Sequence, residues 1–515
     1  MMDNILLKDI QEELATRLME TSSFAPDNNI KQTHFIGHFL KEKKPIKELY
    51  DMCFDRTLLQ KNTVLEGDEK EGVQLHYVDN IKLPTTTGLV FVRLNRTNIV
   101  QNAMKNFRKI LTKMQFSSEE EERSHTTTLI VHSFTSSFFD VMRGCFLASV
   151  AKRLASHSKK RLQCFLCTEY SVRQLHGNDF DELIRTDQWT AATNPQTPTF
   201  KENILTSKDG EKYIDTKLYM KNRTGCTFWS DLNRLELVSE DGKPSRITTR
   251  YLKIQNITLN DQLCLHISPK RNLFKVKSAT FLSEYFGHNC LDNQKFLSYE
   301  EITGGDKELI LSSYIESLTT SYKIRYGPKF MQGDGKEMMV RSMAMSILKL
   351  ELSSTGHNKK IKLSENNPDL DFNRRENTFI LYNYARLCKL ERDFNKKVQE
   401  GAYGCLPEEE DLDFTCLNEP LEWILIRDYV LQFPVFFSNL LKELDKLEIP
   451  AHKIYSFLWS LSHDLSKYYK QVKVLMDCQD HLKVLIRSRF SLMMTLKEVM
   501  LFCFDLLGVV PPNQM

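Results

Sequence analysis

The side chains with the clearest chemical potential lie near the C-terminus, where cations and aromatic rings share helix faces. From about residue 371 the apolar residues recur with the period of a helix, and Tyr382, Arg386 and Lys389 fall on one side of the first such helix. A lysine or arginine neutralises a phosphate and releases counterions, and a tyrosine ring beside it stacks on an unpaired base. This combination is the chemistry of RNA recognition.

Two later segments repeat the pattern of one apolar side and one basic side. Around residues 454–472 the polar side carries Ser456, His463, Lys467 and Lys470, and from 483 to 507 it carries three cations. Gly508, followed by two prolines, ends the last helix. The candidate RNA-contacting residues are Tyr382, Arg386, Lys389, Lys467, Lys470, Lys483, Arg487 and Lys497.

The same periodicity assigns other side chains to the core, and a simple solvated surface remains the alternative to an RNA site. Tyr384, Tyr468 and Leu492 belong to the apolar stripes, so we expect them to pack inside a bundle. On composition alone, a basic helix face is more often a solvated surface than an RNA site. A net charge of +3 on 515 residues gives no global steering toward nucleic acid, so contacts must come from local faces.

Bulk composition is that of an ordinary globular protein with several domains. Hydrophobic residues make up 41% and charged residues 27%, and the length suggests two to four domains. The 12 cysteines are scattered, the N-terminus mixes acidic with apolar residues, and no apolar run approaches the roughly 18 residues that span a bilayer. We therefore expect a cytoplasmic protein, with the nucleus as the alternative, and no membrane partner.

Three units can be distinguished along the chain. Residues 1–115 form an α+β unit that ends in a strand near 88–93 and a helix through 110, followed by a charged linker at 117–123. Residues 125–335 form an α/β core that opens with a strand at 126–134, a helix at 141–154 and a strand at 162–168, which predicts a βαβ unit with a parallel sheet. From 190 to 335 the periodicity is poor. Residues 336–515 comprise a connecting helix at 338–352 and the helical bundle.

Neither a metal site nor a methyl-donor site is predicted. Cys164 and Cys167 form a lone CxxC inside an apolar strand, where residues three apart point to opposite faces, and zinc needs about four ligands. Buried thiols are the preferred interpretation. A methyl-donor site requires a glycine-rich turn after the first strand, and Gly304-Gly305 has no such surroundings. We therefore expect no cofactor.

The C-terminal unit resembles the DALR anticodon-binding domain of class I arginyl-tRNA synthetases. Residues 379–388 (FILYNYARLC) resemble the Tyr-Ala-Arg helix of that family, after an acidic-aromatic lead-in at 369–372. Residues 422–434, 450–469 and 489–515 are similar to its later segments, in the right order over about 145 residues. The four residues that give the domain its name read Met494-Thr-Leu-Lys497 here, which keeps only the leucine. Lysine in place of arginine keeps the attraction for phosphate but loses a bidentate contact.

The α/β core resembles the catalytic core of the same family without its signatures. The alignment of Arg143 and residues 151–154 puts Phe138 and Val141 where the two histidines of the HIGH signature belong, with Asp140 at its glycine. Phe and Val donate no hydrogen bond to ATP phosphates, and an aspartate repels them. The string HFIGH at 34–38 lies too early in the chain, and GDGKE at 333–337 lacks the serine and second lysine of the mobile loop. The strand near 88–93 is similar to the end of the family's additional N-terminal domain.

The resemblance therefore implies a multidomain α/β plus all-α fold, with a degenerate class I synthetase-like core and a C-terminal DALR helix bundle. This order of parts also resembles a family of non-catalytic DALR-domain proteins. That resemblance implies an adaptor that recognises particular arginine tRNAs, not DNA, and partners a methyltransferase-like enzyme that installs 3-methylcytidine in the anticodon loop. Two alternatives stay open, namely an active or vestigial arginine-tRNA ligase and a protein-binding scaffold without an RNA role.

Overall fold

The computed structural model describes residues 52–55, 78–82, 89–116, 125–133, 138–158, 160–168, 190–191, 205–206, 212–216, 234–238, 243–255, 263–285, 293–303, 315–321, 323–324, 336–362, 372–408, 411–477 and 479–514. The linker at 117–123, the HFIGH string at 34–38, Gly304-Gly305 and most of the GDGKE string lie outside these residues.

A parallel five-stranded sheet forms the α/β core. Its order is β11-β10-β4-β5-β6, and every neighbouring pair runs parallel. The strands are β4 (His125–Ser133), β5 (Lys160–Thr168), β6 (Thr190–Ala191), β10 (Cys264–Pro269) and β11 (Gln294–Tyr299). The predicted βαβ unit is confirmed, because α4 (Phe138–Ser156) connects β4 to β5.

Helix α4 joins this sheet to the C-terminal bundle. Every residue from 141 to 151 is buried, and the helix packs on β4 and β5 on one side and on α13 and α15 on the other. A helix that is apolar on all sides belongs inside a core. Gly144 permits the close approach to the sheet, since a Cβ there would lie 2.8 Å from both the Tyr299 hydroxyl and Val131 Cγ1.

A buried arginine ties α4 to the connection that leads into the bundle. The Arg143 guanidinium donates to the carbonyls of Glu300 and, at 3.0 Å, Gly356. Burial lowers the pKa of Arg143 to about 10, with Tyr299 and Glu300 acting in the opposite direction. The arginine remains charged at neutral pH and clamps the end of β11 to the loop at 354–360. Beyond that clamp, β12 (Ile302–Thr303) pairs with β13 (Ile361–Lys362).

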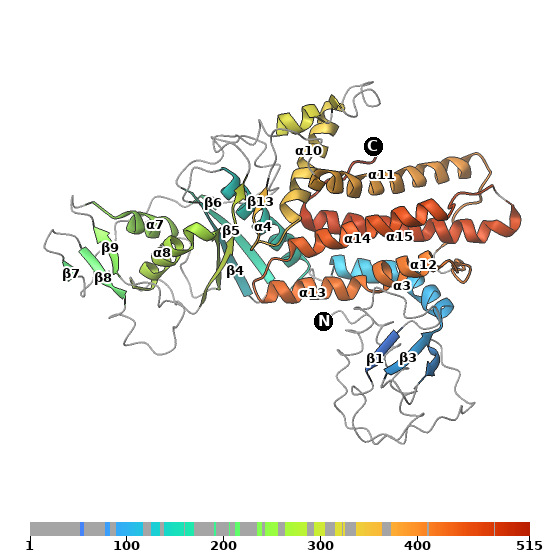
Figure 1. Ribbon diagram of the computed structural model, residues 1–515, viewed down its shortest axis with the longest axis horizontal. Coiled ribbons are helices and arrows are strands. Elements are labelled where there is room, and N and C mark those ends of the chain that lie inside the picture. Colours follow the sequence, from blue (N-terminus) through green and yellow to red (C-terminus); the bar gives the residue numbers. More distant parts are fainter. Residues whose placement is uncertain are drawn as a thin grey trace, which may run out of the picture.

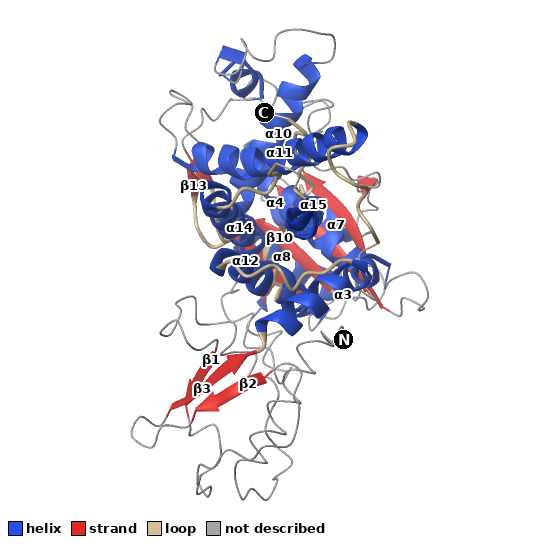
Figure 2. Ribbon diagram, turned by 90° about the vertical axis from the view of Figure 1, so that its right-hand side faces the viewer, coloured by secondary structure: helices blue, strands red, loops and turns tan. Residues whose placement is uncertain are grey.

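The N-terminal unit contributes a small antiparallel sheet and one long helix. The sheet has the order β1-β3-β2, from β1 (Met52–Asp55), β2 (Val78–Lys82) and β3 (Leu89–Leu94). The predicted strand and helix are confirmed, with α3 (Arg96–Phe116) following β3 directly. Helix α3 packs against α12 and α15, so the N-terminal unit is in direct contact with the C-terminal bundle (Figures 1 and 2).

The region that sequence periodicity could not resolve contains a second small sheet and two helices. Strands β7 (Leu205–Thr206), β8 (Lys212–Asp215) and β9 (Arg234–Val238) form an antiparallel sheet, beside α7 (Arg246–Gln255) and α8 (Leu273–Tyr285). The short η3 (Lys270–Asn272) links β10 to α8. Residues of β8, β9, α7 and α8, among them Leu237, Tyr251 and Phe281, form a second core that also includes Ile130 of β4 and Cys167 of β5.

The C-terminal part is the predicted helical bundle. Helix α10 (Lys336–Ser353) is the predicted connection, and the three predicted helices are α11 (Phe372–Gln399), α14 (Ala451–Gln471) and α15 (Lys483–Leu507). The structure adds α12 (Pro420–Ile426), η6 (Arg427–Leu431), α13 (Phe433–Asp445) and the short η7 (Asp480–Leu482). Gly508 ends α15 at φ 65°, a left-handed conformation that glycine adopts without strain.

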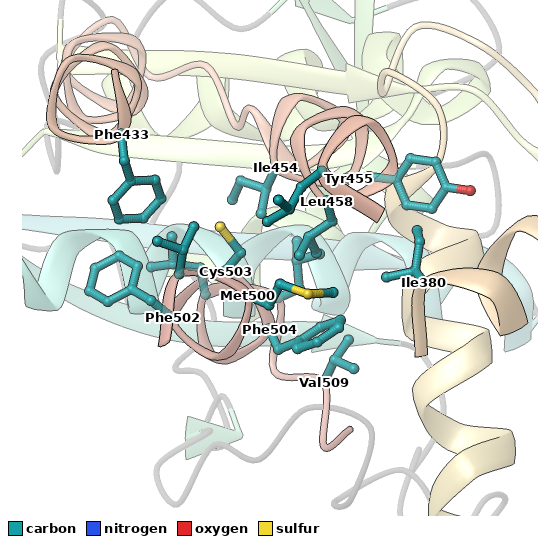
Figure 3. Packing of buried hydrophobic residues seen from close by; sticks show 14 of the residues in the cluster. Ile380, Phe433, Ile454, Tyr455, Leu458, Met500, Phe502, Cys503, Phe504 and Val509 are labelled. Atoms are coloured by element: carbon teal, nitrogen blue, oxygen red, sulfur yellow. The ribbon is translucent and has the colours of Figure 1, made fainter. Parts of the chain in front are cut away.

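One hydrophobic core fills the bundle and continues into the α/β core. Figure 3 shows Phe433, Leu458 and Phe504 pointing into the space between the helices, and the same cluster includes Phe146 of α4 and Phe107 of α3. Tyr384, Tyr468 and Leu492 are buried in it, as predicted. By length and hydropathy the run Pro420–Asp445 resembles a membrane span, but half of its most apolar window is buried, including Phe433 and Phe437 in this core.

The final helix differs from the prediction of one apolar and one basic side. Residues 488–496 of α15 are all buried, because the helix is surrounded by α3, α4, α10, α11 and α14. A two-sided pattern holds only for its first turns, near Lys483 and Arg487. Lys497 lies beyond these turns, where its side chain is 19% exposed and forms an ion pair with Glu391 of α11.

Adding a methyl group at Gly144 tests the contact between α4 and the sheet. We expect Gly144→Ala to lower the free energy of unfolding by about 1–3 kcal/mol, because the new Cβ overlaps a β-branched side chain and a packed tyrosine. Urea denaturation of the full chain measures this difference. The exposed Gly401, unlike Gly144, has a positive φ, and nothing lies within 4 Å of a Cβ added there, so Gly401→Ala measures backbone strain without overpacking. Equal stability of Gly144→Ala and the wild type would contradict the close packing.

Candidate nucleic-acid interface

Cationic and aromatic residues of α11 and α14 lie together on one surface of the bundle. At 100° per residue, Tyr382, Arg386 and Lys389 fall within about 60° on α11. On α14, Trp459, His463 and Lys470 fall within a similar arc. We call this surface the α11/α14 flank and define it by those six residues.

Direct contacts join the two helices that carry the α11/α14 flank. The Arg386 guanidinium lies over the Tyr469 ring of α14, 4.0 Å from its centroid. Lower on the helices, the Tyr455 hydroxyl of α14 reaches Glu376 of α11 at 3.4 Å. The two helices therefore run side by side, and their exposed edges form one surface.

Aromatic rings on the α11/α14 flank are accessible for stacking. Tyr382 is 47% exposed and Trp459 is 37% exposed. Trp459 stacks on His463 with centroids 5.5 Å apart and an interplanar angle of 10°. Sequence reasoning placed His463 on the polar side but missed Trp459. The spacing of four residues between Trp459 and His463 was the available signal.

Lys483 and Arg487 lie at the end of the bundle where α14 turns into α15. Lys483 pairs at 2.6 Å with Asp480, whose side chain is almost fully exposed, and such a pair competes weakly with a phosphate. The Arg487 guanidinium packs against Gly404, in the segment that follows α11, leaving no room for a side chain there. We call Lys483, Arg487 and Gly404 the bundle tip. Lys470 lies in the last turn of α14 and connects the tip to the flank.

Two of the eight candidates point elsewhere. Lys467 donates to Asp464 at 3.1 Å, and Asp464 also accepts from the Tyr429 hydroxyl at 2.7 Å, which draws Lys467 toward η6. Lys497 is held by Glu391 of α11, where both side chains are partly buried. The structure thus brings Tyr382, Arg386, Lys389, Lys470, Lys483 and Arg487 onto neighbouring surfaces and separates Lys467 and Lys497 from them.

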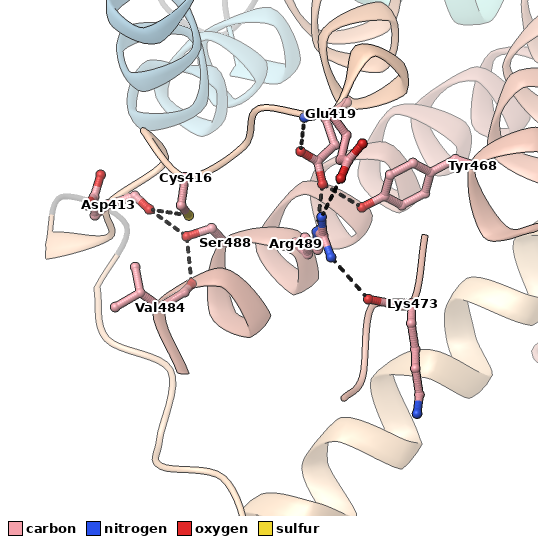
Figure 4. Close-up of polar contacts among 9 residues, drawn as sticks. Asp413, Cys416, Glu419, Tyr468, Lys473, Val484, Ser488 and Arg489 are labelled. Atoms are coloured by element: carbon pink, nitrogen blue, oxygen red, sulfur yellow. Dashed lines mark hydrogen bonds and ion pairs between the residues drawn. The ribbon is translucent and has the colours of Figure 1, made fainter. Parts of the chain in front are cut away.

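A buried ion pair fixes the helices that carry these residues. Glu422 of α12 is fully buried, and its Oε1 accepts from Arg489 Nε at 2.7 Å and from the Tyr468 hydroxyl at 3.1 Å (Figure 4). Its other oxygen accepts from the backbone N–H of Glu419 at 3.0 Å. Burial, and then the carboxylate of Glu422, raise the pKa of Tyr468 above its usual range, so this hydroxyl stays a donor. Arg489 also donates to the carbonyl of Lys473, which secures the connection into α15.

The start of α15 has a second anchor next to the first. The Ser488 hydroxyl lies 2.6 Å from the Asp413 carbonyl and 2.9 Å from the Val484 carbonyl, so the loop before α12 rests on this turn (Figure 4). The Tyr403 hydroxyl donates to the Met476 carbonyl at 2.6 Å. These bonds give the bundle tip a defined shape.

Two histidines and a cysteine of the α/β core are buried, and burial keeps all three uncharged. His132 Nε2 lies 2.8 Å from His266 Nδ1, His266 Nε2 lies 2.8 Å from Gln294, and Phe296 stacks on His266. Burial lowers the pKa of His266 to about 4, so the ring is neutral at physiological pH. Burial raises the pKa of the Cys164 thiol to about 12, which is consistent with the buried-thiol interpretation of the CxxC. No cluster of three or more metal-ligating side chains occurs in the part of the chain that the structure describes.

Comparison with known proteins places this bundle in a family. Residues 380–515 match the family model of the DALR anticodon binding domain. The chain is 28% identical over 263 residues to the DALR anticodon-binding domain-containing protein 3 of Danio rerio, which covers 49% of this chain and 47% of that protein. The corresponding protein of Rattus norvegicus is 29% identical over 173 residues, covering 33% of this chain and 32% of its own length. The matched region thus spans about half or less of these relatives.

The fold of the whole chain is that of the arginyl-tRNA synthetases. The enzyme of Plasmodium falciparum superposes with a TM-score of 0.55 at 12% identity, covering 85% of this chain and 86% of that chain. The fold class predicted from the sequence is therefore confirmed, with a parallel-sheet core and a C-terminal DALR domain.

Removing one partner of the buried ion pair tests its role in the DALR domain. We expect Arg489→Met to lower the free energy of unfolding by about 3–5 kcal/mol, because Glu422 is left as an uncompensated buried charge. Chemical denaturation of the single variant and of the double variant Glu422→Met/Arg489→Met gives the coupling between the two residues. The double variant should be more stable than Arg489→Met alone. Additive losses would contradict direct coupling.

Proposed function

We propose that this chain is a non-catalytic tRNA-binding adaptor of the cytoplasm. It recognises arginine tRNAs through the DALR domain and presents them to a partner methyltransferase that forms 3-methylcytidine in the anticodon loop. The observation that carries the proposal is the α11/α14 flank, where exposed rings and cations adjoin the bundle tip on a domain of the anticodon-binding family.

Physical chemistry assigns distinct roles to these residues. Tyr382 and Trp459 offer faces to unpaired bases of the anticodon loop, and each base stacked on an aromatic ring contributes about 1–3 kcal/mol. Arg386 is already ordered on Tyr469, so little side-chain entropy is lost when it meets a phosphate or a base. Lys470, Lys483 and Arg487 attract the phosphates on either side of the loop.

Loss of both synthetase signatures supports a role without catalysis. Val141, which aligns with a signature histidine, is buried in the first turn of α4. Its side chain has no hydrogen-bond donor for an ATP phosphate. Phe138, aligned with the other histidine, has no side-chain donor either. The chain therefore offers neither group that stabilises charge on ATP in the synthetase mechanism. Aminoacylation would need a different ATP site.

The methyl group is expected to come from the partner. The sequence has no glycine-rich turn after the first core strand, which a methyl-donor site of the nucleotide-binding type requires. The likeness to DALR anticodon-binding domain-containing protein 3 supports pairing with a separate methyltransferase. In this scheme the chain contributes tRNA selection, and the enzyme contributes the chemistry.

Charge reversal at the bundle tip tests the RNA surface. We expect Lys483→Glu/Arg487→Glu to weaken binding of an arginine tRNA and to reduce the slope of log Kd against log salt by about 1–2, because up to two phosphate contacts are lost. Fluorescence anisotropy across a salt series measures both quantities. Lys442→Glu/Lys446→Glu on exposed positions at the end of α13 is the matched control. An unchanged affinity and slope for the tip variant would sink this surface assignment.

Reconstitution tests the adaptor role itself. The partner methyltransferase is incubated with arginine tRNA with and without the chain, and 3-methylcytidine is quantified by mass spectrometry. We expect modification to depend on the chain and to be lost with the tip variant. Arginine-dependent pyrophosphate exchange by the chain alone would instead identify a ligase. Efficient methylation without the chain would refute the adaptor proposal.

A further inference from the structure

The contact between α11 and α14 contains polar groups at positions where a helix bundle is normally apolar. The Asn383 Oδ1 atom, the Ser462 Oγ atom and the Tyr469 hydroxyl are buried, and none has a hydrogen-bond partner in the part of the chain that the structure describes. Asn383 and Ser462 are fully buried. The Asn383 amide nitrogen donates to the Phe379 carbonyl at 2.9 Å, so only its oxygen lacks a partner. We call Asn383, Ser462 and Tyr469 the polar seam.

Helix geometry places the polar seam between the two helices. The hydrogen bond and the cation–π contact described above join α14 to α11 through Tyr455 and Tyr469. At 100° per residue, Ser462 lies about two turns from each of these tyrosines and within about 20° of both. On α11, Asn383 lies within about 20° of Glu376, the partner of Tyr455. The unpartnered atoms therefore belong to the α11/α14 contact itself.

Other buried polar groups that hold the bundle together have partners. Glu422 accepts three hydrogen bonds, and the Ser488 hydroxyl lies within bonding distance of two carbonyls. A buried donor or acceptor without a partner loses its bonds to water and gains none in the fold. Burial raises the pKa of Tyr469, so its hydroxyl stays protonated and remains a donor without an acceptor. The closed contact between α11 and α14 is therefore less stable than an apolar contact of the same size.

The polar seam runs beneath the α11/α14 flank. The exposed ring of Tyr382 lies on the α11 side of the flank, and the exposed ring of Trp459 lies on the α14 side. Arg386 connects the flank to the seam directly, because its guanidinium lies over the Tyr469 ring. A flat base that stacks between rings carried by two different helices pushes those helices apart. Widening of the flank would thus act first on the seam.

We infer that the polar seam opens when an unpaired RNA base enters between the α11 side and the α14 side of the flank. In the closed bundle the three polar groups have no partner, and in the opened bundle they bond to water or to the base. The opened state therefore lies close in free energy to the closed state, and a ligand that binds only the opened state selects it. Side chains that break the rules of packing are expected at sites of function. This inference rests on the proposed function, because the base belongs to the loop of the bound tRNA.

Deleting the two seam hydroxyls in the full chain tests the inference. Ser462→Ala/Tyr469→Phe removes both without adding bulk, so we expect Tm to rise by about 2–4 °C. Because a more stable closed seam opens less often, Kd for the isolated anticodon stem-loop of an arginine tRNA should rise about tenfold. Differential scanning fluorimetry measures Tm, and fluorescence anisotropy measures Kd.

The matched control on the same helix is Tyr455→Phe/Ser456→Ala. It removes the same two kinds of hydroxyl, but here both have partners, since Tyr455 bonds to Glu376 at 3.4 Å and Ser456 to the His452 carbonyl at 2.8 Å. We expect this variant to lower Tm and to bind the stem-loop at least as tightly as the wild type, because its seam opens more easily.

A stem-loop with abasic loop nucleotides separates base entry from phosphate contact. This probe keeps the phosphates that Arg386, Lys389 and Lys470 attract, but it has no base to enter the seam. We expect the wild type and Ser462→Ala/Tyr469→Phe to bind the abasic probe equally, so that the loss appears only with the intact loop.

The two probes distinguish failure of this inference from failure of the proposed function. Wild-type Kd of Ser462→Ala/Tyr469→Phe for the intact stem-loop, or equal losses on both probes, would overturn the inference and leave the proposed function standing. A Tm below that of the wild type would also overturn it, because the two hydroxyls would then have partners in the folded chain. A wild-type chain that binds neither probe would refute the proposed function and this inference together.

Discussion

The buried ion pair between Glu422 and Arg489 is the interaction on which the candidate site depends. It joins α12 to α15 and, through the Tyr468 hydroxyl, to α14. A fully buried carboxylate is tolerable only with several donors, and Glu422 has three, from Arg489, Tyr468 and the backbone of Glu419. Because Arg489 is two residues from Arg487, the same pair fixes the position of the bundle tip.

A shared hydrophobic core extends this order to the rest of the molecule. Helix α4 contacts both the parallel sheet and the bundle, so the DALR domain and the synthetase-like core are packed as one body. The Lys349 ammonium donates to the Gly508 carbonyl at 2.8 Å and the Ser346 hydroxyl donates to the Val510 carbonyl at 2.7 Å, which holds the end of the chain on α10. The synthetase-like core thus supports the C-terminal DALR domain mechanically.

Sequence periodicity predicted the helices and strands whose own residues show a regular pattern of apolar and polar positions or a long apolar run. The βαβ unit and the bundle helices were found because long amphipathic or apolar runs have one interpretation. Strand β10 reads Cys-Leu-His-Ile-Ser-Pro and is buried along its whole length, so it shows no alternation to detect. Strand β7 has two residues and offers no pattern at all.

The sequence did not show which charged side chains are paired or which helix faces are covered. Asp464, which diverts Lys467, is three residues away and visible in the sequence, but Glu391, which holds Lys497, is 106 residues away and is not. The assumption that α15 has an outer side failed because the helix is surrounded by others. Trp459 was overlooked because an apolar ring off the core stripe has no place in a scheme of apolar and basic sides.

The chain therefore combines a synthetase-like scaffold with a C-terminal DALR domain, and we propose that this domain binds tRNA. The most direct test of this account is sequencing of the RNA that co-purifies with the tagged full-length chain from cells, compared with the variant Lys483→Glu/Arg487→Glu. The account predicts enrichment of arginine tRNAs with the wild-type chain and their loss with the variant. An eluate without enriched tRNA would contradict it, and the DALR domain would then serve protein contacts alone.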